Sequence, residues 1–204
     1  MNKRARPPVL AGVAALGVLA ATARGRGRAL DRRVFRAINR ERGPLPDALF
    51  QGITELGSIW ASIGAAVAIA STGRRRQALD ALGAASVAWA VGQALKRAVM
   101  RPRPYRSPGP FRLLIEEPRG TSWPSSHPAV FLSFATVAAR NLSSPGPAKI
   151  GLAAVAGAVG FSRVYLGVHY PADVAGGLLL GWATGRVWSS VASPRLLGGG
   201  ASFA

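Results

Sequence analysis

The feature that most constrains this chain is the separation of its charged residues from its apolar ones. Nearly half of the 204 residues are hydrophobic, and Gly and Pro are also frequent. Most charged residues fall between the apolar runs rather than inside them. Because a charge within the hydrocarbon of a bilayer is costly, this distribution is typical of a chain that crosses a membrane several times.

The apolar residues form six segments. A helix that spans a hydrocarbon core about 30 Å thick needs about 20 residues. Four segments reach that length, whereas the first and fourth need flanking residues to complete a span. The sequence therefore predicts an all-α, polytopic membrane helix bundle with about six transmembrane helices. The segments comprise residues 8–23, 52–72, 78–98, 128–141, 148–166 and 171–190.

The first segment also fits a different interpretation. The basic "MNKRAR", the apolar "VLAGVAALGVLA" and the small residues "ATA" follow one another as in a secretory signal peptide. We expect the segment to be retained as a first membrane helix, because an even number of helices keeps the rest of the layout consistent. Both interpretations stay open from the sequence alone.

Residues 24–50 are polar and strongly basic, but they carry a helical pattern. In "ALDRRVFRAINR", Leu30, Val34, Ala37 and Ile38 share one face of a helix and the arginines occupy the other. This pattern predicts a short helix in the plane of the lipid headgroups, with a solvated connecting helix as the alternative. We expect residues 1–191 to form one membrane-embedded domain and residues 192–204 to be a disordered tail.

The net charge of +18 first suggests nucleic acid, but the 26 basic residues form no domain of their own and no nucleic-acid motif accompanies them. Anionic lipid headgroups or a phosphorylated substrate suit the charge better. The chain has no cysteine and only two histidines, so we expect no metal site and no cofactor. The sequence does not predict an oligomeric state.

The polar residues within or beside the apolar segments gather at four places. These are the end of the third segment, the start of the fourth, the end of the fifth and the start of the sixth. Antiparallel crossings bring all four places to the same side of the bilayer. Both histidines therefore share one face with three cations. The residues are Lys96, Arg103, His127, Ser162, Arg163, His169 and Asp173.

The start of the fourth segment is suited to an anion. In "PSSHPAV", Ser125 or Ser126 can cap a helix, with Pro128 in its first turn. Free N–H groups and the positive end of the helix dipole bind phosphate there. The three cations would add charge-assisted hydrogen bonds, although a basic residue at a helix end often only reaches toward lipid headgroups.

His169 and Asp173 are four residues apart at the start of the sixth segment. This spacing places the carboxylate one turn from the imidazole, where it can accept the ring N–H. Such a carboxylate fixes the tautomer and leaves the other nitrogen free to attack phosphorus. His127 could then protonate the leaving oxygen. A purely structural hydrogen bond is the alternative for the pair taken alone.

Three blocks of the sequence resemble the signature of the type 2 phosphatidic acid phosphatase superfamily. The blocks are "KRAVMRPRP" from Lys96 to Pro104, "PSSH" from Pro124 to His127, and "SRVYLGVHYPAD" from Ser162 to Asp173. The signature specifies residue types and spacing in three separate places, so a match is highly specific. Its one departure is Ser126, which stands where the family pattern has glycine and puts substrate preference in doubt more than activity.

The resemblance implies a role for each matched residue. His169 would be the nucleophile that forms a phosphohistidine, Asp173 would orient it, and His127 would be the general acid toward the leaving lipid alcohol. The phosphate would be held by Lys96, Arg103, Ser125, Arg163 and the backbone N–H of Ser126. The family works without a metal ion.

We therefore expect a membrane phosphatase that acts on a lipid phosphate. Polyprenyl diphosphates, phosphatidic acid and phosphatidylglycerol phosphate remain possible substrates, with a polyprenyl (di)phosphate favoured. The alternatives are a non-enzymatic membrane module or transporter, and an enzyme of the vanadium haloperoxidase type. We expect the active site on the extracytoplasmic face, although more than half of the 26 basic residues lie on the active-site side, which by itself favours the opposite orientation.

Overall fold

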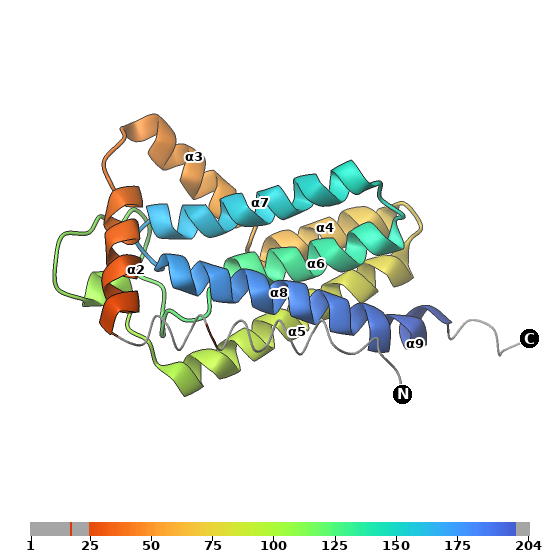
Figure 1. The fold of residues 1–204 in the computed structure, drawn as a ribbon. Coiled ribbons are helices and arrows are strands. Elements are labelled where there is room, and N and C mark those ends of the chain that lie inside the picture. Colours follow the sequence, from red (N-terminus) through yellow and green to blue (C-terminus); the bar gives the residue numbers. More distant parts are fainter. Residues whose placement is uncertain (1–16, 18–24, 199–204) are drawn as a thin grey trace, which may run out of the picture.

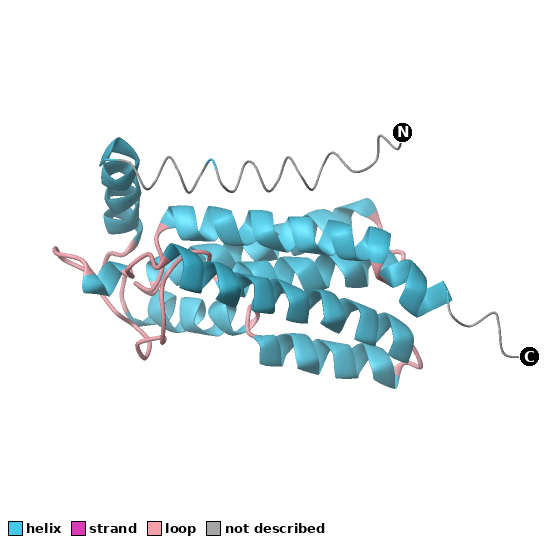
Figure 2. Ribbon diagram, turned by 90° about the horizontal axis from the view of Figure 1, so that it is seen from below, coloured by secondary structure: helices cyan, strands magenta, loops and turns pink. Residues whose placement is uncertain are grey.

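The apolar segments fold into helices, and the part of the chain that the structure describes contains no strand (Figure 2). The structure is a computed structural model in which residue 17 and residues 25–198 are described. The helices are α2 (Gly25–Ile38), α3 (Pro44–Glu55), α4 (Ile59–Ser71), α5 (Arg75–Val99), the 3₁₀ turn η2 (Pro104–Arg106), α6 (Ser126–Asn141), α7 (Gly146–Tyr165), α8 (Pro171–Val191) and α9 (Ser193–Gly198).

Helices α5 to α8 run antiparallel as a bundle, with α6 packed most extensively against α5 and α8 (Figure 1). Their bounds lie within a few residues of the four apolar segments expected from residue 78 onward. The end of α5, the start of α6, the end of α7 and the start of α8 all lie at one end of the bundle. The fold therefore confirms the prediction that these four helix ends lie together.

Helix α8 approaches α6 through a ladder of glycines. A Cβ atom added at Gly177 would lie 2.2 Å from the Ser125 carbonyl oxygen, and one at Gly181 would lie 2.5 Å from the Ala129 carbonyl oxygen. A Cβ atom added at Gly185, the next glycine four residues on, would lie 2.9 Å from the Thr136 side chain. Small residues at this spacing let helix backbones meet in the way that membrane helices commonly pack.

The segment expected over residues 52–72 is not one unbroken helix, so the prediction of a continuous helix there is wrong. Helices α3 and α4 meet at a bend of 62°. Ser58 caps α4 by accepting a hydrogen bond from the Ala61 N–H at 3.0 Å, and Gly57 in the turn packs against His127. The N-cap serine stops the helix that the apolar pattern alone would continue, and the bend brings the turn against the end of the bundle.

By length and hydropathy, one helix in the described residues passes as a membrane span. It is α5 with its continuation, Arg75–Arg106, and the bent pair α3 and α4 passes together as a second. Helix α6 has only 16 residues, and α8 is rich in the glycines that pack it against α6. The first apolar segment, residues 8–23, lies outside the described residues except for Gly17, so its retention stays a prediction.

Helix α2 forms within the basic segment, as predicted, and lies across the end of the bundle (Figure 1). Its predicted apolar face is only partly its buried face, however. Leu30 and Val34 are exposed, whereas Asp31, Phe35 and Asn39 are buried against the bundle. The expected apolar stripe is thus divided: Leu30, Val34 and Ala37 are exposed where headgroups would meet them, whereas Ile38 packs with Phe35 against Val164 and Tyr170 of the bundle.

The tail expected from residue 192 begins with the short helix α9 rather than without structure. Ser193 is buried and donates a hydrogen bond to Asp80 at 2.7 Å, and Trp188 and Asn141 donate to the same carboxylate at 2.8 Å each. This carboxylate ties α5, α6, α8 and α9 together at the end of the bundle far from α2. Residues 199–204 lie outside the described residues.

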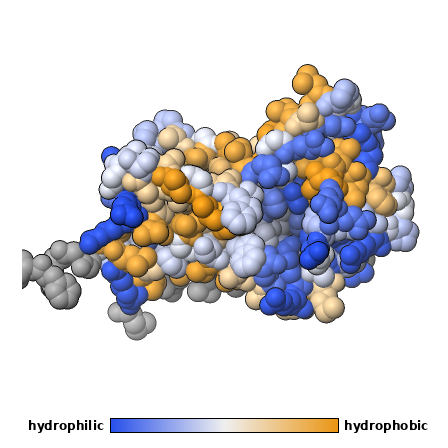
Figure 3. Space-filling view, turned by 180° about the vertical axis from the view of Figure 1, so that it is seen from behind, coloured by the Kyte–Doolittle hydropathy of each residue, from blue (hydrophilic) through white to orange (hydrophobic). Residues whose placement is uncertain are grey.

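The surface divides in the same way as the sequence does. Hydrophobic residues cover much of the bundle, and hydrophilic residues gather over the end that carries α2 (Figure 3). Large apolar side chains on the flanks, such as Trp60 and Ile150, are exposed. A face of this kind suits lipid along the bundle and water or headgroups at the α2 end.

The close packing at the glycines of α8 predicts that a methyl group added there destabilises the protein, whereas one added at an open glycine does not. Gly181→Ala forces α8 away from α6, and we expect it to lower the free energy of unfolding by about 1–3 kcal/mol. Gly157→Ala on α7 is the matched control, because a Cβ there meets nothing within 4 Å. The control should be neutral or slightly stabilising, since alanine favours a helix over glycine. Unfolding of the detergent-solubilised protein tests both, and equal effects would contradict the packing argument.

Candidate active site

The site lies where α5 ends, α6 begins and the short turn joins α7 to α8. His169 is in that turn and Asp173 in the first turn of α8. The Asp173 carboxylate lies 3.4 Å from His169 Nδ1 and accepts the Tyr170 N–H at 2.8 Å through the same oxygen. Both side chains are buried. The structure thus brings the predicted His–Asp pair together at the start of a helix.

Arg103 lies on the other side of the His169 ring. Its Nη1 is 3.3 Å from His169 Nε2 and donates to the Val168 carbonyl at 3.0 Å, while its Nε donates to the Gly120 carbonyl at 3.1 Å. Since a guanidinium only donates, we assign Nε2 as the unprotonated nitrogen and Nδ1 as the one that carries hydrogen toward Asp173. The free electron pair of the imidazole therefore points to the cationic side of the site.

Burial lowers the pKa of His169 well below its ordinary value, and the nearby charges of Lys96, Arg103 and Arg163 lower it further. A buried imidazolium beside three cations is unfavourable for both reasons. His169 is therefore neutral at neutral pH before an anion binds, which is the form required of a nucleophile.

Two further cations complete the positive surroundings. Lys96, at the end of α5, donates to the Thr121 carbonyl at 3.0 Å. Arg163, at the end of α7, donates from Nη1 to the Thr54 hydroxyl of α3 at 2.8 Å. Lys96 and Arg163 are both buried. The break between α3 and α4 is what allows Thr54 to reach Arg163.

Helix α6 begins at Ser126, with Ser125 as the N-cap residue and His127 in the first turn. The Ser126 hydroxyl accepts a hydrogen bond from Gln93 at 3.3 Å. Ser125 is fully buried, and its hydroxyl makes no capping hydrogen bond. Four buried side-chain atoms of the described residues have no hydrogen-bond partner, among them Trp123 Nε1 and Ser189 Oγ; the other two, Ser125 Oγ and Arg163 Nε, belong to predicted phosphate ligands. Buried polar groups are nearly always satisfied, so these two atoms mark a place where a polar ligand fits.

The structure also places residues at the site that the sequence reasoning missed. Thr54 holds Arg163, and Arg101 donates to Asp173 at 2.7 Å while its other nitrogen contacts Asp31 of α2. The signals were present but weak. Arg101 lies inside the first signature block, and Asp31 is a lone acid within a run of arginines.

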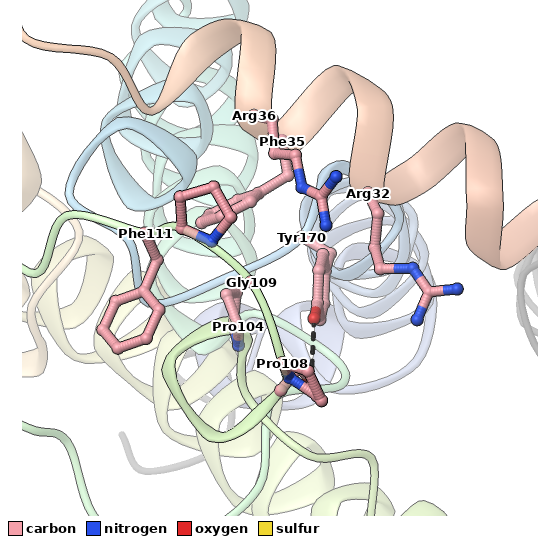
Figure 4. Close-up of a pocket in the computed structure, with 10 residues that line it drawn as sticks. Arg32, Phe35, Arg36, Pro104, Pro108, Gly109, Phe111 and Tyr170 are labelled. Carbon is pink, nitrogen blue, oxygen red and sulfur yellow. Dashed lines mark hydrogen bonds between the residues drawn. The ribbon is translucent and has the colours of Figure 1, made fainter.

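A small cavity lies between α2 and the loop after Arg103 (Figure 4). Arg32, Phe35 and Arg36 of α2 line one side, and Pro104 and Tyr170 are among the residues that line the other. Pro104 follows Arg103 and Tyr170 follows His169 in the chain, so the cavity is lined by the chain neighbours of two predicted site residues. In the described part of the chain, no group of three or more potential metal ligands occurs.

The comparisons with known proteins agree with this geometry. The family model of the PAP2 superfamily matches residues 77–196, which contain all three signature blocks. The chain belongs to this superfamily, the type 2 phosphatidic acid phosphatases that the sequence blocks resemble. It is accordingly a phosphatase, a hydrolase of phosphoric esters.

Two curated relatives are phosphatases of polyprenyl lipids. The chain is 34% identical over 136 residues to a decaprenylphosphoryl-5-phosphoribose phosphatase of Mycobacterium tuberculosis, covering 67% of this chain and 73% of the relative. It is 38% identical over 95 residues to an undecaprenyl-diphosphatase of Sulfolobus acidocaldarius, covering 47% of this chain and 45% of the relative.

Two solved structures share the fold. A transmembrane phosphatidylglycerolphosphate phosphatase of Bacillus subtilis matches with a TM-score of 0.77 and 26% identity, over 90% of this chain and 94% of the relative. LpxE of Aquifex aeolicus matches with a TM-score of 0.70 and 29% identity, over 79% of this chain and 95% of the relative. These similarities agree with a helical membrane protein, as the apolar segments predict.

Proposed function

We propose that this chain hydrolyses a lipid phosphate through a phosphohistidine formed on His169. One observation carries the proposal. His169 Nε2, which we assign as unprotonated, lies 3.3 Å from Arg103 Nη1, at a site that also contains two buried, unpartnered polar atoms, Ser125 Oγ and Arg163 Nε. A phosphoryl group at this position would satisfy both atoms and offset the charge of the three cations.

In the first step, His169 Nε2 attacks phosphorus and the bond from phosphorus to the lipid oxygen breaks. His127 gives that oxygen a proton, so the lipid leaves as an alcohol, or as a lipid phosphate if the substrate is a diphosphate. Asp173 stabilises the charge that develops on the His169 ring. Lys96, Arg103, Arg163, Ser125 and the N–H groups at the start of α6 stabilise the transferring phosphoryl oxygens.

In the second step, water attacks the phosphohistidine, His127 accepts a proton from that water, and inorganic phosphate forms as the bond to His169 breaks. No metal ion takes part in either step. The two other candidates account for less of the geometry. A non-enzymatic module or transporter needs no neutral imidazole oriented by a carboxylate, and a haloperoxidase-type enzyme needs no apolar bundle surface for a lipid.

We expect phosphate release that resists EDTA and is lost in His169→Ala. His127→Ala should be slow on a lipid substrate. On p-nitrophenyl phosphate it should recover the release of p-nitrophenol in the first turnover, because an acidic leaving group needs no proton, but not the steady-state rate, because His127 also accepts the proton of the attacking water. Rates of detergent-purified protein on both substrates test this. Release that survives His169→Ala, or that EDTA abolishes, would contradict the mechanism.

We further propose a polyprenyl diphosphate or a similar polyprenyl lipid with two phosphates as the substrate class. The names of both curated relatives describe lipids of this kind. The cavity between α2 and the loop after Arg103 adds support, because two cations, Arg32 and Arg36, are among its lining residues and could pair with a second phosphate (Figure 4).

Arg36→Gln should therefore lower kcat/KM for undecaprenyl diphosphate about fivefold, the effect of a mostly exposed charge contact of about 1 kcal/mol. It should leave hydrolysis of phosphatidic acid unchanged. Arg33→Gln is the matched control on the same helix, because Arg33 does not line the cavity. Equal losses on both lipids, or a preference of the unaltered protein for phosphatidic acid, would count against the assignment.

We also propose that the chain crosses the bilayer six times and that the site faces the extracytoplasmic side. The antiparallel helices from α5 onward support the layout, with residues 8–23 and the α3–α4 pair as the remaining crossings. The chain has no cysteine, so single cysteines report topology cleanly. In intact cells, a membrane-impermeant maleimide should label Glu117→Cys near the site and should not label Ala148→Cys at the far end of the bundle. The reverse pattern would place the site inside.

A further inference from the structure

Arg101 connects the candidate nucleophile to the helix that lies across the bundle end. Its Nη1 donates to Asp173 Oδ1 at 2.7 Å, and its Nη2 forms an ion pair with Asp31. The guanidinium also lies 4.5 Å from the centre of the Tyr170 ring. Each of these partners is buried, and the Arg101 side chain is 15% exposed.

The two oxygens of Asp173 consequently have separate tasks. Oδ1 accepts from Arg101, whereas Oδ2 accepts the Tyr170 N–H and faces His169 Nδ1. A carboxylate held at both oxygens cannot rotate, and the adjacent guanidinium favours its ionised form. Arg101 therefore determines how Asp173 meets His169.

Asp31 prevents Arg101 from acting as one more phosphate ligand. It accepts from Arg101 through one oxygen and from the Ala172 N–H at 3.0 Å through the other. Arg101 is thus engaged by two carboxylates on the Asp173 side of His169, while Arg103 lies on the Nε2 side, where phosphorus would be attacked. The rings of Phe35 and Tyr170 pack edge to face with their centres 5.5 Å apart, so α2 contacts the turn between α7 and α8 that carries His169 (Figure 4).

We propose that Arg101 and Asp31 are positioning residues of the phosphoryl-transfer site, and that α2 is part of the catalytic unit through them. Arg101 orients Asp173 toward His169 Nδ1, and Asp31 holds Arg101 in the orientation that does so. The inference rests on the proposed role of His169. It extends the site beyond the three signature blocks to a helix that precedes them in the chain.

The test uses full-length protein that elutes as a single folded species. Arg101→Gln should lower kcat for the lipid substrate at least about tenfold, because the His–Asp pair loses its orientation. The KM, and the inhibition constant and binding stoichiometry of inorganic phosphate, should stay within about twofold, since Arg101 does not touch the phosphate. Arg101→Lys should recover part of kcat, and Arg97→Gln, an exposed arginine at the same helix end, is the control.

Asp31 acts through Arg101, so their effects should not multiply. Asp31→Asn should lower kcat by itself but add nothing in the Arg101→Gln background. The inference is overturned if Arg101→Gln retains the kcat of the Arg97→Gln control, if phosphate binding weakens in parallel with kcat, or if the two losses multiply. Failure of the proposed function is distinguishable, because it would be seen first as unchanged activity in His169→Ala.

Discussion

The repulsion among three buried cations is the constraint on which this end of the molecule depends. Lys96, Arg103 and Arg163 enter one site from the end of α5, the following loop and the end of α7. Each is held by a neutral acceptor, the Thr121 carbonyl, the Gly120 and Val168 carbonyls, and the Thr54 hydroxyl respectively. Neutral dipoles orient the cations without cancelling their charge, which leaves the site ready for an anion.

On the Asp173 side of His169, buried charges of both signs are paired with one another. Asp173, Arg101 and Asp31 alternate in sign from the imidazole outward to α2. The alternation limits the cost of burying each charge, because every charge there has a partner of opposite sign. His169 thus separates a positive region that suits phosphate from a balanced network that suits a fixed carboxylate.

Much of this organisation is predictable from the sequence, because apolar length and antiparallel crossing determine which helix ends meet. The positions of His127, His169 and Asp173 follow from that reasoning, and the helices from α5 onward agree with it. The bend at Gly57 and Ser58 was missed because a long apolar run hides a local N-cap. The buried face of α2 was missed because Asp31 and Asn39 are buried for their hydrogen bonds to distant residues, which no periodicity in hydrophobicity reports.

The central claim is that His169 carries the phosphoryl group during turnover, and direct observation of that bond tests it best. Protein mixed with lipid labelled with ³²P at its terminal phosphate would be quenched in alkali, in which phosphohistidine survives, and the labelled peptide identified by mass spectrometry. We predict label on His169 that appears and decays at rates consistent with turnover. Turnover by the same preparation with no label on His169, or with label on His127 instead, would contradict the mechanism.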